Sequence, residues 1–279
     1  MGLTGVDGRN LRRVVGAAAA VTAAVQTATA VAALRRGRRD YVDAVWGPGL
    51  GAIAVTAAAV GRGDPVRRWG LAAVTSVWAA RLGGQIAGRL RTSDREDPRY
   101  TEYLEGDSTA AVVGKVFVTQ GLAQLVVSAP IQLAAASAVP RTARRWLVPA
   151  GLAVMVAGTA IEALADRQKD RYRARTDEAK PPILDTGLWG WSRHPNYFGD
   201  SLVWDGAWLA SAASAPGGWT VPAPALMSYL LIVATGARRT ERRMQDRPGY
   251  REYQRRVSFF VPLPPGKRDE QRDERRSRR

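Results

Sequence analysis

The sequence contains no cysteine and only one histidine, His194. Without cysteine the chain has no disulfide framework and no thiolate that could act as a nucleophile or metal ligand. A single histidine also excludes a metal centre built on clustered imidazoles, although ions held by carboxylates alone are not excluded. We therefore assign no metal site.

Long stretches of the chain lack charge, although the mean hydropathy of -0.20 is typical of a soluble protein. The stretches are rich in alanine, and most approach the roughly 20 residues needed to cross a hydrocarbon core. A soluble alanine-rich helix would instead carry charges every third or fourth residue on its solvent face. We therefore predict insertion into a membrane. The uncharged stretches are Val14–Leu34, Val45–Val60, Trp69–Ala80, Val116–Val139, Trp146–Ile161, Ser201–Pro224 (interrupted only by Asp205) and Ala225–Ala237.

The 41 Lys and Arg residues are shared unequally between the two sides that such spans would define. With seven spans and an outer N-terminus, most fall in the inner loops and the tail, the side that positive residues prefer. We predict an all-α, polytopic membrane helix bundle of about seven transmembrane helices, integral to the cell membrane, with the N-terminus outside and the C-terminus cytosolic. A six-span count, which would move the first arginine cluster, is the alternative. The arginines on the outer side would be Arg9, Arg12, Arg13, Arg62, Arg67, Arg68, Arg141, Arg144 and Arg145.

No linker or repeat divides the chain, so residues 1–264 are predicted to form a single membrane-embedded domain. Polar residues become dense from Glu162 onward, and residues 162–264 are predicted to be its cofactor-binding half. Residues 265–279 are predicted to be a basic disordered tail, because the run from Lys267 has no apolar residue. The basic residues behind the formal charge of +16 lie at the predicted membrane edges and in this tail, and no nucleic-acid-binding motif accompanies them. The expected partner is therefore the lipid bilayer, and no nucleic acid.

The densest polar constellation is the run Arg-His-Pro-Asn-Tyr-Phe-Gly-Asp from Arg193 to Asp200. Pro195 suits the first turn of a helix, whose free N–H groups attract anions, and Arg193 adds a guanidinium fork for phosphate. Asn196 offers both a donor and an acceptor, as needed to read an amide or a purine edge. Gly199 would let a flat ligand approach the backbone. The same run is also typical of a helix start within an interfacial aromatic belt.

Three further groups of polar residues could take part in binding or chemistry. Arg81 ends a largely apolar span that also carries Trp78; a charge there usually faces a cavity or a partner, although arginine can also snorkel. Glu162, Asp166 and Arg173 are spaced close to whole helical turns and can share one face. A solvated charged helix produces similar patterns. The third group lies in a charged helix predicted around residues 238–256 and comprises Glu241, Tyr250 and Tyr253.

Taken in order, these residues resemble one known group of membrane proteins. The series resembles the bacterial steroid 5-alpha-reductase-like family, within the larger group that also holds the isoprenylcysteine carboxyl methyltransferases. The resemblance covers about the last two thirds of the chain, and its strongest element is the His-Pro-Asn-Tyr-Phe-Gly run with the C-terminal tyrosine pair. The series comprises Trp78 and Arg81, Arg99-Tyr100, Glu162…Asp166…Gln168, Gly187-Leu-Trp, the run Ser192–Asp200, Glu241, and Pro248-Gly-Tyr-Arg-Glu-Tyr…Phe-Val-Pro.

Members of this family are seven-helix membrane proteins that take hydride from NADPH at a site open to the cytosol, and the resemblance implies the same here. By this resemblance, Asn196 would hold the nicotinamide amide. Asp166, Arg173 and Asp200 would contact the ribose and phosphate regions. The hydride acceptor would be a carbon–carbon double bond in a hydrophobic lipid, steroid-like or isoprenoid substrate.

The resemblance also implies cationic contacts to the cofactor and a closing segment. Arg81 would reach the pyrophosphate or the 2′-phosphate, with Arg89 nearby. Glu241 and Tyr250 would close the pocket from the tail. The other residues expected to line it are Glu162, Arg193, His194, Tyr197 and Tyr253.

One departure from the family pattern concerns the substrate. Steroid reductases of this group place a tyrosine where this chain has Trp78, and an indole has only an N–H and cannot supply that proton. This departure argues against assuming a 3-keto-4-ene steroid, and another conjugated lipid, isoprenoid or fatty acyl chain fits equally well. Tyr100 or Tyr103 is predicted to be the proton source.

Two other functions fit the same residues. A methyltransferase using S-adenosylmethionine shares the Arg-His-Pro-x-Tyr-x-Gly pattern, the late glutamate and the paired tyrosines. Asn196 after the proline, and Asp200, favour the NADPH reductase instead. A non-catalytic lipid-binding relative with the same fold is the third interpretation, because Trp78 departs from the catalytic pattern.

Overall fold

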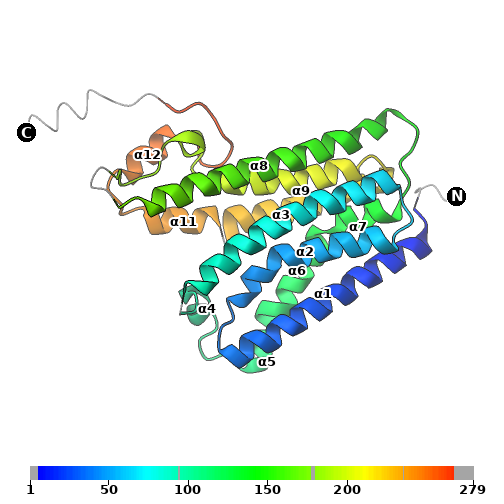
Figure 1. Cartoon of the computed structure of the whole chain (residues 1–279), viewed down its shortest axis with the longest axis horizontal. Coiled ribbons are helices and arrows are strands. Elements are labelled where there is room, and N and C mark those ends of the chain that lie inside the picture. The colour runs from blue at the N-terminus through cyan, green and yellow to red at the C-terminus, as the bar shows by residue number, and fades with distance from the viewer. Residues whose placement is uncertain (1–5, 94, 177–179, 235, 267–279) are drawn as a thin grey trace, which may run out of the picture. The chain divides into compact units, whose positions relative to one another are not determined.

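The computed structural model describes residues 6–93, 95–176, 180–234 and 236–266 (Figure 1). Within these ranges no β-strand forms, and β pairing is limited to the isolated bridges Val6–Ser137 and Ser192–Ser258. The predicted all-α fold is thus confirmed for the described part of the chain. The tail predicted to be disordered lies, from residue 267 on, outside the described residues.

The chain forms long helices joined by short helical pieces. Some of these pieces are 3₁₀- or π-helices, labelled η. The elements are α1 (Gly8–Arg36), α2 (Tyr41–Val60), α3 (Pro65–Arg91), α4 (Pro98–Tyr103), α5 (Thr109–Val112), η1 (Val113–Val118), α6 (Thr119–Val127), α7 (Ala129–Ala136), η2 (Ala143–Trp146), α8 (Leu147–Ala174), η3 (Gly187–Gly190), α9 (Pro195–Ser211), η4 (Ala215–Thr220), α10 (Pro222–Tyr229), η5 (Leu230–Ala234), α11 (Ala237–Met244) and α12 (Tyr250–Arg256).

Five helical segments of the described chain are long and apolar enough to cross a membrane, judged by length and composition. This finding supports a helical membrane protein, as the uncharged stretches predicted. The count of about seven spans and the outer N-terminus stay predictions. The five segments are Gly8–Arg36, Tyr41–Val60, Thr109–Val127, Ala143–Ala174 and Ala215–Met244.

The chain divides into two compact units, which are described separately. Unit 1 comprises Met1–Val156 and Val203–Met227, and unit 2 comprises Ala157–Leu202 and Ser228–Arg279. The segment predicted to be the cofactor-binding half, residues 162–264, falls in unit 2 apart from residues 203–227. Both α8 and α9 contribute residues to each unit.

In unit 1, α1, α2 and α3 lie side by side (Figure 1). Small residues allow α2 and α3 to approach closely, because a Cβ added at Gly51 would lie 2.9 Å from the Cβ of Ala79. The fully buried Gln124 then joins α6 to α2 and α1. Its amide nitrogen donates to the carbonyl oxygen of Trp46 at 3.0 Å, and its amide oxygen accepts from Gln26 at 2.9 Å.

Arg67 lies at the first turn of α3 and is fully buried in unit 1. Its guanidinium donates to the carbonyl oxygens of Ala134 and Ser137 at 2.9 and 2.7 Å. It also donates to the hydroxyls of Ser137 and Ser214, at 2.9 and 3.2 Å. Arg67, assigned by the sequence to the outer side, is thus a buried helix residue of unit 1, and the side of the membrane on which it lies stays a prediction. Carbonyl oxygens at the end of α7 replace the water that its guanidinium would otherwise need.

Several predicted boundaries differ from the structure. The stretch Val116–Val139 is not one helix, because α6 ends at Val127 and α7 begins at Ala129. Arg81 is not at a helix end, since α3 continues to Arg91. The charged helix predicted around residues 238–256 is two helices, α11 and α12. Gly249, with φ of 78° after Pro248, turns the chain between them.

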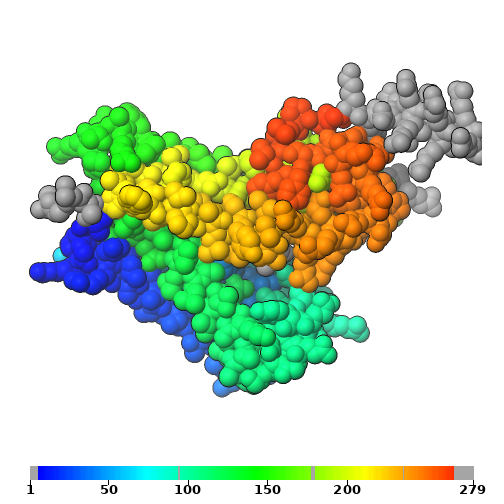
Figure 2. Space-filling view, turned by 180° about the vertical axis from the view of Figure 1, so that it is seen from behind, coloured from blue at the N-terminus to red at the C-terminus, as the bar shows by residue number. Residues whose placement is uncertain are grey.

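In unit 2, residues from the second half of α8 pack against the start of α9. A Cβ added at Gly199 would lie 2.6 Å from the backbone nitrogen of Glu162 and 2.7 Å from the carbonyl oxygen of Gly158. Gly199 thus permits helix–helix contact, and the expectation that it gives a flat ligand access to the backbone is wrong. The segments α11, α12 and residues 257–266 form a C-terminal lobe, coloured orange to red in Figure 2.

Candidate functional site

The start of α9 is held by one local hydrogen bond and by hydrogen bonds to the segment after α12. Pro195 occupies the first helical position, as predicted, where its missing N–H costs nothing. The hydroxyl of Ser192 accepts from the backbone nitrogen of His194 at 3.0 Å and donates to the carbonyl oxygen of Phe260 at 2.7 Å. The Arg193 backbone nitrogen donates to the carbonyl of Ser258 at 2.9 Å. The run before α9 is therefore fixed to the segment after α12.

A single carboxylate, that of Glu241 on α11, is the centre of this attachment. It accepts from Arg193 through Nε at 2.9 Å and Nη2 at 3.2 Å, and from the hydroxyl of Tyr250 at 2.8 Å. The amide of Gln254 donates to it, and Nε2 of His194 lies 3.1 Å away. We call these five residues the Glu241 cluster. Only 8% of Glu241 is exposed, so the charge is paired largely out of water.

The Glu241 cluster uses most of the hydrogen-bonding capacity of its members. Nη1 of Arg193 donates to the carbonyl oxygens of Gln254 and Val257, at 2.9 and 2.7 Å. The Arg193 fork predicted to bind phosphate is thus already occupied by protein acceptors. Phe259 covers this guanidinium, with its ring centre 5.5 Å from the Arg193 carbon Cζ. The Glu241 cluster therefore fixes the position of the start of α9.

Burial controls the protonation of two members of the Glu241 cluster. Desolvation lowers the pKa of His194 below its ordinary value of 6.5, and the nearby Glu241 carboxylate offsets this only in part. The imidazole is thus neutral at neutral pH. Desolvation and then the bond to Glu241 raise the pKa of Tyr250, so its phenol keeps the proton that it donates. Tyr197 stacks on His194 with ring centres 5.7 Å apart.

A row of buried polar side chains runs along the contact between α8 and α9. Nδ2 of Asn196 donates to Oδ1 of Asp166 at 3.2 Å. Oδ1 of Asn196 is buried and has no hydrogen-bond partner among the described residues. Asn196 therefore retains one acceptor and one further N–H for a ligand amide. The row, with exposures of 4 to 9%, comprises Glu162, Asp166, Asn196 and Asp200.

A pocket of about 410 Å³ opens beside the Glu241 cluster within unit 2. Arg238 and Arg242, one helical turn apart on α11, form its cationic wall and are both exposed to solvent. Phe259 supplies an aromatic surface. An anionic ligand with a flat ring would find charge and stacking here. The remaining lining residues are Glu241, Gln245 and Gln254.

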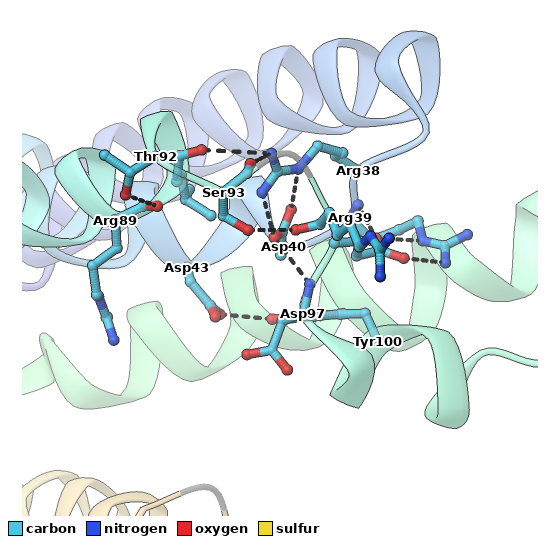
Figure 3. Close-up of polar contacts among 12 residues, drawn as sticks. Arg38, Arg39, Asp40, Asp43, Arg89, Thr92, Ser93, Asp97 and Tyr100 are labelled. Atoms are coloured by element: carbon cyan, nitrogen blue, oxygen red, sulfur yellow. Dashed lines mark hydrogen bonds and ion pairs between the residues drawn. The ribbon is translucent and has the colours of Figure 1, made fainter.

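In unit 1, α4 and the start of α2 form a second charged group (Figure 3). Asp43 accepts from the Tyr100 hydroxyl at 2.6 Å and from Nη2 of Arg99 at 3.0 Å. Burial, and then the Asp43 charge, raise the pKa of Tyr100, which stays protonated. Arg89 extends from α3 near Asp43. Of the two predicted proton sources, Tyr100 is thus held in place, whereas Tyr103 is 60% exposed.

The structure brings together only part of the predicted site. Arg193, His194, Glu241 and Tyr250 meet in one cluster, and Asp166 meets Asn196. Tyr253 packs against Tyr250 of the Glu241 cluster, with ring centres 5.9 Å apart, and its hydroxyl donates to the carbonyl of Trp189 at 2.7 Å. Among the described residues of unit 2, Arg173 lies apart from these groups and is exposed at the end of α8. The predicted residues in unit 1 are Arg81, Arg89, Tyr100 and Tyr103.

Sequence reasoning missed several residues of these groups. Gln254 and Asp43 carry no motif of their own, and only the three-dimensional contacts identify them. Arg238 and Arg242 could have been found, because they lie four positions apart in the predicted charged helix and so share one face. Trp78, the departure from the family pattern, is fully buried and contacts Trp204 edge-to-face with ring centres 5.3 Å apart. Its observed role is packing within unit 1.

Comparison with known proteins matches the chain to a family and to an uncharacterized relative. A family described as "Protein of unknown function (DUF1295)" matches residues 30–257. An uncharacterized protein of the yeast Schizosaccharomyces pombe is 32% identical over 122 residues. That match covers 37% of this chain and 35% of the yeast protein, so the chain spans about a third of that relative's length. No solved structure matches the chain.

Proposed function

Because the chain belongs to DUF1295, a steroid 5-alpha-reductase-like family of unknown function, we propose that it is a membrane-bound reductase. It transfers hydride from NADPH to a carbon–carbon double bond in a hydrophobic lipid. The observation that carries this proposal is the buried amide oxygen of Asn196, which has no partner among the described residues. A nicotinamide carboxamide presents the N–H donor that this oxygen lacks and a carbonyl for the second Asn196 N–H.

The residues of unit 2 fit the different parts of this cofactor. NADPH, when bound, supplies the hydride, and Asn196 holds its carboxamide. Asp166 orients Asn196 through the 3.2 Å bond between them. Buried carboxylates repel phosphate but accept hydrogen bonds from ribose hydroxyls. We therefore assign the ribose contacts to Asp200 and Glu162.

The phosphates belong at the exposed cationic wall formed by Arg238 and Arg242, where guanidinium forks suit phosphate oxygens. Phe259 provides a face on which the adenine can stack. The Glu241 cluster positions the segment that leads into Asn196. The hydrogen-bond donors of the cluster already bond acceptors within the protein. In this proposal Arg193 and His194 are positioning residues. Contacts from Arg81, Arg89 and Arg173 stay predictions of the sequence.

The reaction also requires one proton from the protein or solvent. The sequence predicts Tyr100 or Tyr103, and the bond from Tyr100 to Asp43 favours Tyr100 as the one with a fixed orientation. We expect Tyr100→Phe to lower turnover by roughly 10²–10⁴-fold, the usual contribution of general acid catalysis. Tyr103→Phe is the matched control and should leave turnover near wild type. Equal turnover of the Tyr100→Phe variant and the wild type would remove Tyr100 from the mechanism.

Binding of the cofactor can be tested before any substrate is known. The purified protein in detergent is heated with NADPH, NADH or S-adenosylmethionine. A ligand at a hundredfold excess over its dissociation constant stabilises the folded state by about 2.7 kcal/mol. We expect stabilisation by NADPH, and its loss in Asn196→Ala.

A matched control separates the loss of a contact from the loss of a fold. Asn10 is also a buried asparagine, 4% exposed, whose amide bonds the carbonyl of Ala136 and the backbone nitrogen of Arg62 in unit 1. Asn10→Ala should lower stability yet keep the response to NADPH. Stabilisation by S-adenosylmethionine alone would instead assign the protein to the methyltransferases. NADPH binding with no turnover on any lipid would favour the non-catalytic relative.

A further inference from the structure

A second pocket, of about 600 Å³, lies in unit 1 where α2 ends and α3 begins. Arginines line it from two separate parts of the chain: Arg13 on α1, and Arg62 and Arg68 around the turn between α2 and α3. Its lining includes no acidic residue from the part of the chain that the structure describes. The pocket is therefore built for an anion, and it is not the NADPH pocket proposed above, which lies in unit 2.

The turn that carries Arg62 is held in one conformation. The backbone nitrogen of Gly63 donates to the carbonyl of Ala135 at 2.8 Å, and that of Arg62 donates to Oδ1 of Asn10 at 3.1 Å. Cβ atoms added at Gly61 and Gly63 would lie 2.4 and 2.5 Å from backbone oxygens of the segment that ends α7. Only glycine fits at both positions. The pocket is thus preformed, which reduces the entropy lost on binding.

The three guanidinium groups have unused capacity. Among the described residues, Arg13, Arg62 and Arg68 form no ion pair. Nε of Arg68 is buried without a hydrogen-bond partner in the described part of the chain. Asp64, which lies between Arg62 and Arg68 in the sequence, caps α3 by accepting from the backbone nitrogen of Arg67 and is not among the residues that line the pocket. Three charges on a fixed wall, with no ion pair to any described residue, favour a phosphate ligand.

The position of the pocket points to a lipid as the source of that phosphate. It lies at the ends of α1 and α2, two of the helices able to cross a membrane, and hence at the level of lipid head groups. Two exposed tryptophans occur in the same unit, near the starts of α3 and α8. Trp69 follows the first turn of α3 and is 47% exposed, and Trp146 precedes α8 and is 65% exposed. Exposed tryptophan is typical of the interface between membrane and water.

We propose that the pocket formed by Arg13, Arg62 and Arg68 binds the phosphate of an anionic membrane phospholipid. A zwitterionic lipid fits less well, because the lining offers no carboxylate for its ammonium group. The assignment depends on unit 1 alone and does not require the reductase proposed above.

The test compares lipids added to the delipidated full-length protein in detergent, with bound lipid counted by native mass spectrometry. Phosphatidylglycerol should bind, whereas phosphatidylcholine with the same acyl chains should not. The triple variant Arg13→Gln, Arg62→Gln, Arg68→Gln should lose roughly a hundredfold in affinity, since each arginine contributes about a fivefold factor near an anionic lipid. The corresponding triple lysine variant keeps the charge and should retain most of the binding, which separates a lost site from a lost fold.

A second triple variant distinguishes a pocket from general surface charge. Arg141→Gln, Arg144→Gln and Arg145→Gln removes the same charge from exposed positions of unit 1 that do not line the pocket. It should bind phosphatidylglycerol nearly as the wild type does. Equal losses in the two glutamine variants would overturn the proposal, and so would equal binding of phosphatidylcholine. Displacement of the lipid by inorganic phosphate at equimolar concentration would assign the pocket to a soluble phosphate instead.

Discussion

Replacing Glu241 by glutamine keeps the shape of the side chain but removes the negative charge that the other four residues of the Glu241 cluster contact. The side chain of Arg193 is 11% exposed, so its charge would remain largely buried without a counter-ion. Removing one partner of a buried pair typically costs about 3–5 kcal/mol. We expect the lower end, about 3 kcal/mol, because glutamine retains an oxygen that can still accept one hydrogen bond. For a chain of this size that corresponds to a fall in melting temperature of roughly 6–12 °C.

Glu252→Gln provides the matched control for this variant. Glu252 lies in the same lobe, but its side chain is 41% exposed and its contact to Arg256 is 3.6 Å long. Such a surface pair contributes about 0.5 kcal/mol or less, so the melting temperature should barely change. The assay is thermal unfolding in detergent, with both variants compared under identical conditions. Equal melting temperatures for the two variants would refute the claim that the Glu241 cluster stabilises the fold.

A double-variant cycle then measures the pairing itself. Arg193→Gln and Glu241→Gln should each destabilise the protein, and the double variant should lose clearly less than their sum. A coupling of about 1 kcal/mol or more is expected for groups in one bonded network. NADPH affinity should fall in both single variants, because the Glu241 cluster positions the segment that leads into Asn196. Additive effects would indicate that the two side chains act independently.

Two further predictions concern the same unit. The NMR signal of the imidazole, unambiguous because His194 is the only histidine, should titrate below pH 6.5, and a midpoint above 6.5 would contradict its burial. Since the unfolded chain binds this proton more readily than the folded one, stability should decrease as the pH falls below about 6.5 and recover as it rises. Gly199→Ala should cost about 1–3 kcal/mol, because the new methyl group meets the backbone of α8. Gly88→Ala, which meets nothing within 4 Å in α3, should be neutral or stabilising, and equal losses in both would refute the close contact.

The helices were largely predictable because charged residues are rare in segments that cross a membrane. The uncharged stretches from Val14 and Val45 became α1 and α2, and Pro195 marked the start of α9. Interruptions within uncharged stretches were less visible, since the break between α6 and α7 at Ser128 leaves hydropathy unchanged. The division between α11 and α12 could have been predicted, because Pro248 and Gly249 are a turn signal.

The candidate site was predictable in its members but not in their contacts. Glu241 and Arg193 were both assigned to the cofactor, yet the structure pairs them with each other. A sequence pattern reports which groups are present and cannot say whether they bond a ligand or one another. Arg67 illustrates the same limit, because burial depends on carbonyl oxygens from α7 that lie far away in the chain.

The central claim is that a hydride moves from NADPH to a lipid, and a deuterium label tests it most directly. The protein in detergent is incubated with NADPH deuterated at C4 of the nicotinamide and with an extract of membrane lipids. The account predicts one lipid product that gains one deuterium from the cofactor and one proton from the solvent, and none with Asn196→Ala. The account would be contradicted if no lipid gained deuterium while a methyl label from S-adenosylmethionine appeared in a product.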